Sequence, residues 1–125
     1  MRIVADIDVV VSGLLWTGGP RLLLDAARAD VIELVTSPAL LEELVDVLER
    51  PKFAALATVV EPTAIEPVVV ADPDDDHVVA CALAANADLI VSGDDHLLSV
   101  GEYRGIRIVA ATQALIEIAG RSRTT

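Results

Sequence analysis

The order of apolar runs along the chain is the feature that most restricts its fold. Short runs of Val, Ile and Leu alternate with longer segments that have helical spacing and helix-capping residues. Strands that are apolar on both faces are typical of a parallel sheet covered by helices on each side. The sequence therefore predicts a three-layer α/β/α sandwich with a mainly parallel central sheet. The expected strands are residues 2–11, 31–37, 68–71, 88–93 and 105–109.

Proline and capping residues set the expected bounds of the helices. Ser37 and Asp72 are N-cap candidates, and each is followed directly by a proline, which is favoured at the first helical position. Pro51 is expected to end the second helix, and Gly120 the last. The expected helices are residues 20–30, 38–50, 72–87 and 112–120, with a turn-rich connection over 12–20, a loop over 52–66 and a short helix or turn over 94–100.

Length and composition indicate one small domain. The chain has 125 residues, 54% of them hydrophobic, which suffices for one core; we expect a single domain over 1–120 and a frayed tail over 121–125. Aromatic residues are only 2%, so no platform for stacking bases is visible. Cys81 is the single cysteine, which excludes an internal disulfide, and we expect it in the core. No apolar stretch is long enough to span a membrane, so we expect a cytoplasmic protein without membrane contact.

Acidic residues interrupt the first apolar run. The net charge is −11, which repels phosphate unless a cation intervenes. Asp6 and Asp8 occupy alternate positions, so in an extended strand both carboxylates leave the same face. Burying two neighbouring carboxylates is unfavourable unless a positive charge lies between them. Asp6 is the strongest single indication of a site, because neither capping nor exposure explains an aspartate in the middle of a strand.

Acids in three further segments are expected at the same edge of the sheet. In a parallel sheet the loops at the carboxyl ends of the strands form the site. Clustered oxygen ligands suit Mg²⁺ or Mn²⁺, so the sequence predicts a site for one of these cations. The further acids are Glu42 and Glu43, residues 72–76, and Asp94 and Asp95.

Each of these segments also has a simpler interpretation. The 72–76 run can cap a helix, the two glutamates can lie on a solvated helix face, and Asp94 and Asp95 can be turn residues. His77 and His96, the two histidines, could join carboxylates in a zinc site without a recognised spacing. A phospho-receiver domain would need a lysine after its last strand, and the only lysine is Lys52. A phosphatase with an aspartate nucleophile would match the "DID" of residues 6–8 but not the residues after it.

Four stretches, taken in order, resemble a PIN domain, the nuclease fold of VapC-type toxins, and more closely the short bacterial PIN proteins regarded as toxin components. They are "VADIDVVVSGLLWTGGP", "ELVTSPALLEELVDVLERPKF", "DPDDDHVVACALAANADLIVSGDDHLL" and "YRGIRIV", and together they cover most of the chain.

The resemblance implies a metal-dependent endoribonuclease and assigns residues to it. Asp6, Glu43, Asp75 and Asp94 match the four catalytic acids; Asp6, Asp75 and Asp94 are the implied metal ligands, and Ser92 supports them. Asp8 is a further candidate ligand. The implied cofactor is Mg²⁺ or Mn²⁺, which activates a water for attack on RNA. The implied partners are an RNA substrate, a second copy of the chain and a small antitoxin whose arginines reach the acidic site.

The chain departs from the family pattern in ways that leave two functions open. Ile7 and Asp8 stand where the family usually has "DTNV", and the segment from Lys52 to Asp72 is shorter than usual. Arg50 and Lys52 are the basic candidates near the expected RNA groove. The main hypothesis is an active ribonuclease. The alternative is a catalytically weakened PIN fold that binds RNA or a protein.

Overall fold

A computed structural model describes residues 1–44, 50–61 and 73–123, with the backbone alone for 73–76 and 121–123. Six strands form one sheet in the order β3-β2-β1-β4-β6-β5. All neighbouring pairs are parallel except the edge pair β5–β6. The strands are β1 (Arg2–Ala5), β2 (Glu33–Thr36), β3 (Ala57–Val59), β4 (Leu89–Val91), β5 (Glu102–Tyr103) and β6 (Ile106–Val109).

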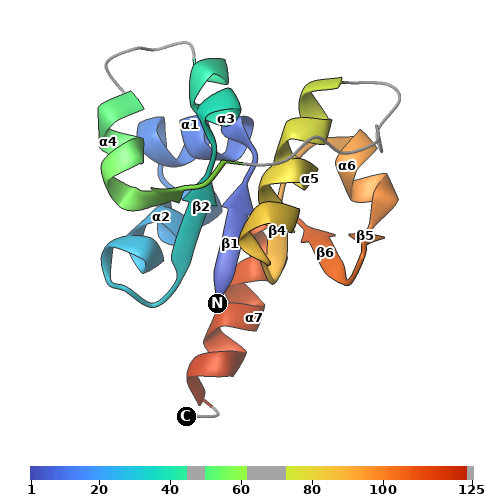
Figure 1. The fold of residues 1–125 in the computed structure, drawn as a ribbon. Coiled ribbons are helices and arrows are strands. Elements are labelled where there is room, and N and C mark those ends of the chain that lie inside the picture. The colour runs from blue at the N-terminus through green and yellow to red at the C-terminus, as the bar shows by residue number, and fades with distance from the viewer. Residues whose placement is uncertain (45–49, 62–72, 124–125) are drawn as a thin grey trace.

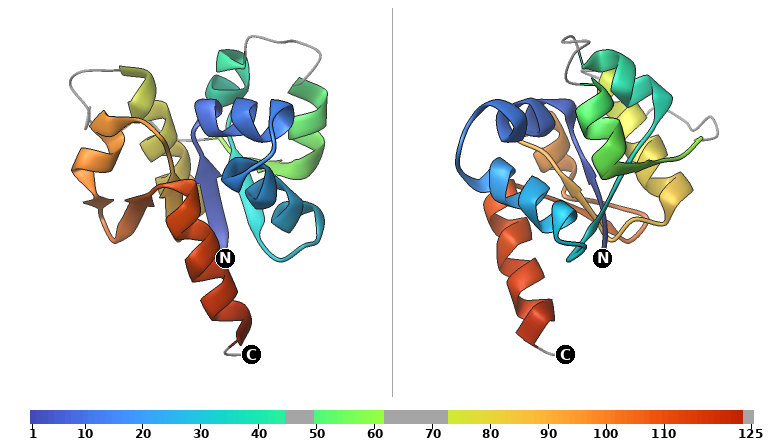
Figure 2. Two further views of the ribbon diagram at one scale, coloured as in Figure 1. Left: turned by 180° about the vertical axis from the view of Figure 1, so that it is seen from behind. Right: turned by 90° about the vertical axis from the view of Figure 1, so that its left-hand side faces the viewer.

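Helices cover both faces of this sheet. Helices α1 (Ile7–Leu15), α2 (Gly19–Arg28) and α7 (Ala111–Arg123) lie on one face, and α5 (Pro73–Ala85) lies on the other (Figures 1 and 2). Helices α3 (Pro38–Glu43), α4 (Arg50–Leu56) and α6 (Asp95–Val100) are shorter. The expected three-layer α/β sandwich with a mainly parallel sheet is confirmed.

The first strand is shorter than its sequence predicts. We expected a strand over 2–11, but β1 ends at Ala5 and a helix begins at Ile7, with Asp6 as its N-cap. Packing overrides the β preference of the valines: Val9 and Val10 are buried, and Gly13 lies close to α2. Asp6 and Asp8 therefore do not share a strand face.

The middle of the chain holds two elements that were expected to be loop. Helix α3 ends at Glu43, and Pro51 lies in the first turn of α4, where its missing N–H is tolerated, instead of ending a helix. Phe53 of α4 is fully buried, and β3 follows at the sheet edge. The expected strand over 68–71 and the Asp72 cap lie outside the described residues.

Most other predicted elements are confirmed. The structure has β2, β4 and β6 within the expected ranges, and Pro20 lies at the start of α2. Ser37 caps α3, its hydroxyl accepting from the Leu40 N–H at 3.3 Å. Gly120 does not end α7, which continues through Arg123, and the two-residue strand β5 was not predicted.

The core lies between the sheet and its helices. Cys81 of α5 is fully buried, and burial raises the pKa of its thiol to about 12, with a smaller opposing effect from Ser37.

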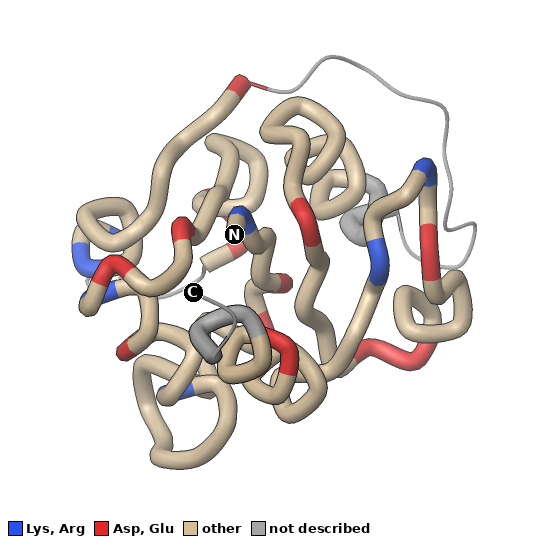
Figure 3. Tube along the Cα trace, turned by 90° about the horizontal axis from the view of Figure 1, so that it is seen from below, with Lys and Arg blue, Asp and Glu red and all other residues tan. Residues whose placement is uncertain are grey.

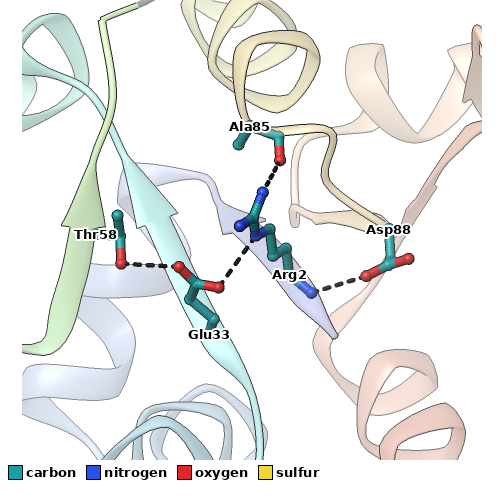
Figure 4. Close-up of polar contacts among 5 residues, drawn as sticks. All are labelled: Arg2, Glu33, Thr58, Ala85 and Asp88. Carbon is teal, nitrogen blue, oxygen red and sulfur yellow. Dashed lines mark hydrogen bonds and ion pairs between the residues drawn. The ribbon is translucent and has the colours of Figure 1, made fainter.

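A polar network joins β1, β2 and α5 at the amino end of β1. The Arg2 side chain donates to Glu33 of β2 at 3.1 Å and to the Ala85 carbonyl of α5 at 2.8 Å (Figure 4).

No single helix in the described part of the chain is long and apolar enough to cross a membrane. Helices α1 and α2 would reach the required length and apolar character only as a pair, and they meet at a bend of 88°.

Candidate functional site

The strand order creates a switch point at the carboxyl edge of the sheet. The chain runs from β1 outward to β2 and β3 on one side, and later places β4 and β6 on the other side of β1. Ligands of open α/β sheets bind where the strand order reverses in this way. Asp6 follows β1 directly and Ser92 follows β4 directly, so both lie at this point. The backbone N–H of Asp6 donates to the Val91 carbonyl at 2.9 Å, which joins the two strand ends.

Ser92 connects two of the predicted acidic residues. Its hydroxyl donates to Asp6 Oδ2 at 2.9 Å and accepts from the backbone N–H of Asp94 at 2.9 Å. The serine is buried, whereas both aspartates are half-buried. Ser92 thus uses its hydroxyl as donor and acceptor at once, and it fixes the Asp6 carboxylate relative to the backbone of Asp94.

Asp94 also begins a helix. It is the N-cap of α6, and its Oδ1 accepts from the His96 N–H at 2.7 Å. The exposed His96 ring lies beside this carboxylate, with Nδ1 3.4 Å from Oδ1. The sequence had suggested Asp94 as a simple turn residue or as a site acid; the structure makes it a helix cap that also lies beside Asp6 at the switch point.

The Asp6 carboxyl lies in an unfavourable electrostatic environment. Burial raises its pKa above the ordinary value, as do, more weakly, the charges of Asp8 and Asp94; hydrogen bonds from Ser92 and from the Ile7 N–H oppose this rise. Asp6 is the N-cap of α1, yet its side chain makes no capping hydrogen bond. Asp8, in the first turn of α1, is exposed. The charges of Asp8 and Asp94 thus act on the Asp6 carboxylate, although Asp6 and Asp8 do not lie on one strand.

Glu43 approaches the same edge from the end of α3. Its side chain is 24% exposed, and Oε1 lies 3.9 Å from Nδ1 of His77 on α5. Helix α5 begins at the edge toward which β1 points (Figure 1). The backbone places Asp75 in the first turn of this helix, but the Asp75 side chain lies outside the described residues.

The structure therefore brings together some of the predicted residues directly. Asp6, Ser92 and Asp94 form one connected group, and Asp8 interacts with it through charge. Glu43 lies beside His77 of α5. Among the side chains described, no group of three or more His, Cys, Asp or Glu side chains is arranged to hold a metal ion.

The histidines were interpreted from the sequence only as possible zinc ligands. In the structure each lies beside a different predicted acid, His77 beside Glu43 and His96 beside Asp94. In the sequence each histidine directly follows a run of aspartates, "DDDH" and "DDH". That proximity did not show which carboxylate each ring would face in the fold.

The donor set at the switch point suits a hard cation. Carboxylate and hydroxyl oxygens are what Asp6, Asp8, Asp94 and Ser92 offer, and Mg²⁺ and Mn²⁺ prefer oxygen. A cation would also offset the repulsion that contributes to the raised Asp6 pKa. The residues present fit such an ion, with Asp75 as the remaining expected ligand.

The chain thus belongs to the class of three-layer α/β proteins that carry carboxylates at the switch point of the sheet. The comparison with known families makes the class specific: the model of the PIN domain matches residues 2–96, and the chain belongs to that family. No curated protein and no solved structure matches the chain. PIN domains generally have a nuclease-type fold, and the match includes all four predicted acids.

Proposed function

We propose that this protein is an endoribonuclease that depends on Mg²⁺ or Mn²⁺ and acts as the toxin of a toxin–antitoxin pair. The observation that carries the proposal is the group formed by Asp6, Ser92 and Asp94 at the switch point of a PIN fold. A half-buried carboxylate crowded by two others is unfavourable for folding. Such an arrangement is typical of a site that binds a cation.

The position of each residue indicates its proposed role in cleavage. Asp6, Asp94 and Asp75 would hold the cation, with Asp8 at its edge; when bound, the cation supplies an activated water and stabilises charge on the phosphodiester. Ser92 orients the Asp6 carboxylate and favours its ionised form, because its hydroxyl donates to Oδ2. Glu43, across from the strand ends, would orient the attacking water by accepting its hydrogen bond.

The proposed partners follow from the acidic edge and from the apolar surface. Exposed carboxylates suit the guanidinium groups of a small antitoxin, since arginine binds a carboxylate through two parallel hydrogen bonds. A homodimer would cover apolar side chains that are now exposed. These are Leu15 and Trp16 at the end of α1, Leu22 of α2 and Ile116 of α7. We propose the cytoplasm as the location in which it meets RNA.

One observation favours a second candidate function. Asp8, which stands where the family usually has asparagine, adds a negative charge that raises the Asp6 pKa. This extra charge also repels phosphate. A PIN fold with weakened chemistry that binds RNA or a protein is therefore the alternative.

The test is cleavage of labelled single-stranded RNA by purified protein with Mg²⁺, with Mn²⁺ or with EDTA. Asp6→Asn is the site variant, and Asp25→Asn, which changes an exposed aspartate on α2, is the matched control. We expect cleavage that requires metal, survives in the control and falls by roughly 100-fold or more in Asp6→Asn, as for the loss of a principal electrostatic group.

Cleavage that is equal in Asp6→Asn, or that persists in EDTA, would refute the proposed chemistry. Metal-independent RNA binding without cleavage would support the alternative. The toxin role has its own test: induced expression of the wild type should stop bacterial growth, and expression of Asp6→Asn should not.

A further inference from the structure

Arg50 makes two hydrogen bonds that enclose Glu43. Its Nε donates to the Leu44 carbonyl at 2.7 Å, and its Nη2 donates to the Glu42 carbonyl at 3.0 Å. The two acceptors belong to the residues immediately before and after Glu43. One planar guanidinium therefore binds the backbone on both sides of the predicted catalytic glutamate.

The end of α3 requires such a partner. The helix has six residues and ends at Glu43, and Leu44 turns into an extended conformation with φ −75° and ψ 99°. The last carbonyls of a helix have no partner within it, and they carry partial negative charge. The Glu43 carboxylate adds a full negative charge at this place. A guanidinium satisfies two carbonyls and offsets the charge, which a neutral donor could not do.

Arg50 is itself held firmly by the residues that follow it. It is the first residue of α4, Pro51 fixes the backbone of the first turn, and Phe53 is 0% exposed in the core. In the stretch "RPKF", the buried Phe53 thus fixes the start of α4, from which the Arg50 side chain extends to the end of α3. The sequence had indicated Arg50 only as a basic residue beside an RNA groove.

We propose that Arg50 is a positioning residue that fixes Glu43 for catalysis. The proposal rests on the proposed function, because it assigns Glu43 a role in cleavage. Glu43 extends from the fixed turn to within 3.9 Å of His77 on α5, the helix that carries Asp75. A shift of the two flanking peptide units would move the carboxylate relative to that helix. A displacement of about 1 Å at a reacting group can reduce a rate 100-fold.

This role predicts an effect on kcat and not on KM. Arg50→Met should lower kcat roughly 10- to 100-fold with KM unchanged, because RNA binding does not use the guanidinium. Glu43→Gln should lower kcat as well, and adding Arg50→Met to it should lower kcat no further. Arg50→Lys should recover only part of the rate, since one ammonium group cannot reproduce the planar pair of bonds.

Arg2→Met is the matched control. Arg2 likewise donates to a backbone carbonyl at a helix end, Ala85 of α5, but at the opposite edge of the sheet (Figure 4). Its loss should lower the melting temperature about as much as Arg50→Met does, and leave kcat unchanged. If kcat falls in both variants in proportion to the loss of melting temperature, the positioning role of Arg50 is overturned.

An amide hydrogen-exchange measurement keeps the inference testable if the wild type does not cleave RNA. Arg50→Met should accelerate exchange in the last turn of α3, over 40–44, and Arg2→Met should not. Unchanged exchange there would overturn the inference regardless of activity. An increase in KM with a smaller salt dependence of RNA binding would instead show that Arg50 contacts phosphate. Absence of wild-type cleavage, with faster exchange in Arg50→Met, would refute the proposed function and leave the contact with α3 established.

Discussion

Ser92 links the ionisation of Asp6 to the backbone that carries Asp94. Its hydroxyl lowers the Asp6 pKa against the larger opposing effect of burial. Loss of that hydroxyl therefore leaves a carboxyl that binds its proton more tightly. It also leaves the Asp94 N–H without its acceptor.

Ser92→Ala should shift the acid limb of the pH profile of kcat/KM to higher pH, because the Asp6 pKa rises further. At neutral pH we expect a loss of roughly 10-fold, in line with a charge-assisted hydrogen bond of about 1.5–3 kcal/mol. Ser92→Thr should retain the wild-type profile. Ser99→Ala, which removes a hydroxyl that donates to the Asp95 carbonyl of α6, is the control. An unshifted acid limb in Ser92→Ala would contradict this account.

Asp6 should reduce stability in the absence of metal. Folding raises its pKa, so between the ordinary value of 3.8 and the raised value the folded state binds more protons than the unfolded state. Stability therefore falls as pH rises through this window, and the full loss remains at neutral pH.

Asp6→Asn should accordingly raise the melting temperature at neutral pH without metal, and the gain should disappear at a pH well below 3.8. Asparagine is as favourable as aspartate at an N-cap, so α1 should begin unchanged. Added Mn²⁺ should stabilise the wild type and not the variant. Thermal unfolding with and without metal measures both effects. If Asp6→Asn is less stable than the wild type at neutral pH without metal, the Asp6 carboxylate does not destabilise the fold.

Helices α1 and α2 pack closely against each other at Gly13. A Cβ added at Gly13 would lie 2.7 Å from Leu24 Cδ1 and 2.8 Å from the Pro20 carbonyl oxygen. The absence of a side chain at this position therefore allows α1 to turn directly from the strand and lie on α2. This contact sets the direction in which the chain leaves Asp6.

Gly13→Ala should destabilise the fold by about 1–3 kcal/mol, as expected for overpacking against backbone. Gly120 of α7 is the matched control because nothing lies within 4 Å of its added Cβ, and Gly120→Ala should stabilise by about 0.5–1 kcal/mol. Urea unfolding of both variants measures the difference. Equal effects in the two variants would show that the α1–α2 contact is loose.

The sequence predicted those elements whose signals are local. β2, β4 and α2 have strong apolar patterns or a proline at a defined position, and the structure contains each of them. Residues 7–11 of α1 were mistaken for strand, and residues 12–15 for a turn-rich connection, because an apolar run of β-branched residues has no period and only its packing on α2 decides its form. Pro51 was interpreted as a stop because the sequence does not show whether a proline ends one helix or begins the next.

The site was predictable to the extent that it depends on strand ends. Asp6 and Asp94 follow neighbouring parallel strands, so their meeting with Ser92 at one edge follows from the fold class. The contacts of Arg50 were not predictable, because backbone carbonyl acceptors leave no mark in a sequence.

The charge of the whole molecule limits how it can hold RNA. The net charge is −11 with nine basic residues, of which one is a lysine, against 20 acidic residues, and the basic positions lie in several separate parts of the trace (Figure 3). Arg50 is committed to α3, which leaves fewer cations for phosphate. Under the proposed function, RNA binding is therefore expected to depend more on a bound divalent ion than on side-chain charge.

RNA binding should accordingly show a shallow salt dependence, with a slope of log K against log salt smaller in magnitude than about 2, as for fewer than three phosphate contacts on a single strand. Binding should also weaken strongly in EDTA. Fluorescence anisotropy of a labelled RNA over a KCl series measures both. A steep slope that EDTA does not change would show that basic side chains, and not a bound cation, hold the RNA.

Cys81 gives the molecule an internal indicator of its own opening. The thiol is fully buried, and its high pKa leaves almost no thiolate while the fold is closed. An alkylating reagent can therefore react only during the brief periods in which α5 separates from the sheet. The labelling rate of this one sulfur measures how often that happens, and any cation or partner that binds the closed form will slow it without a reporter having to be introduced.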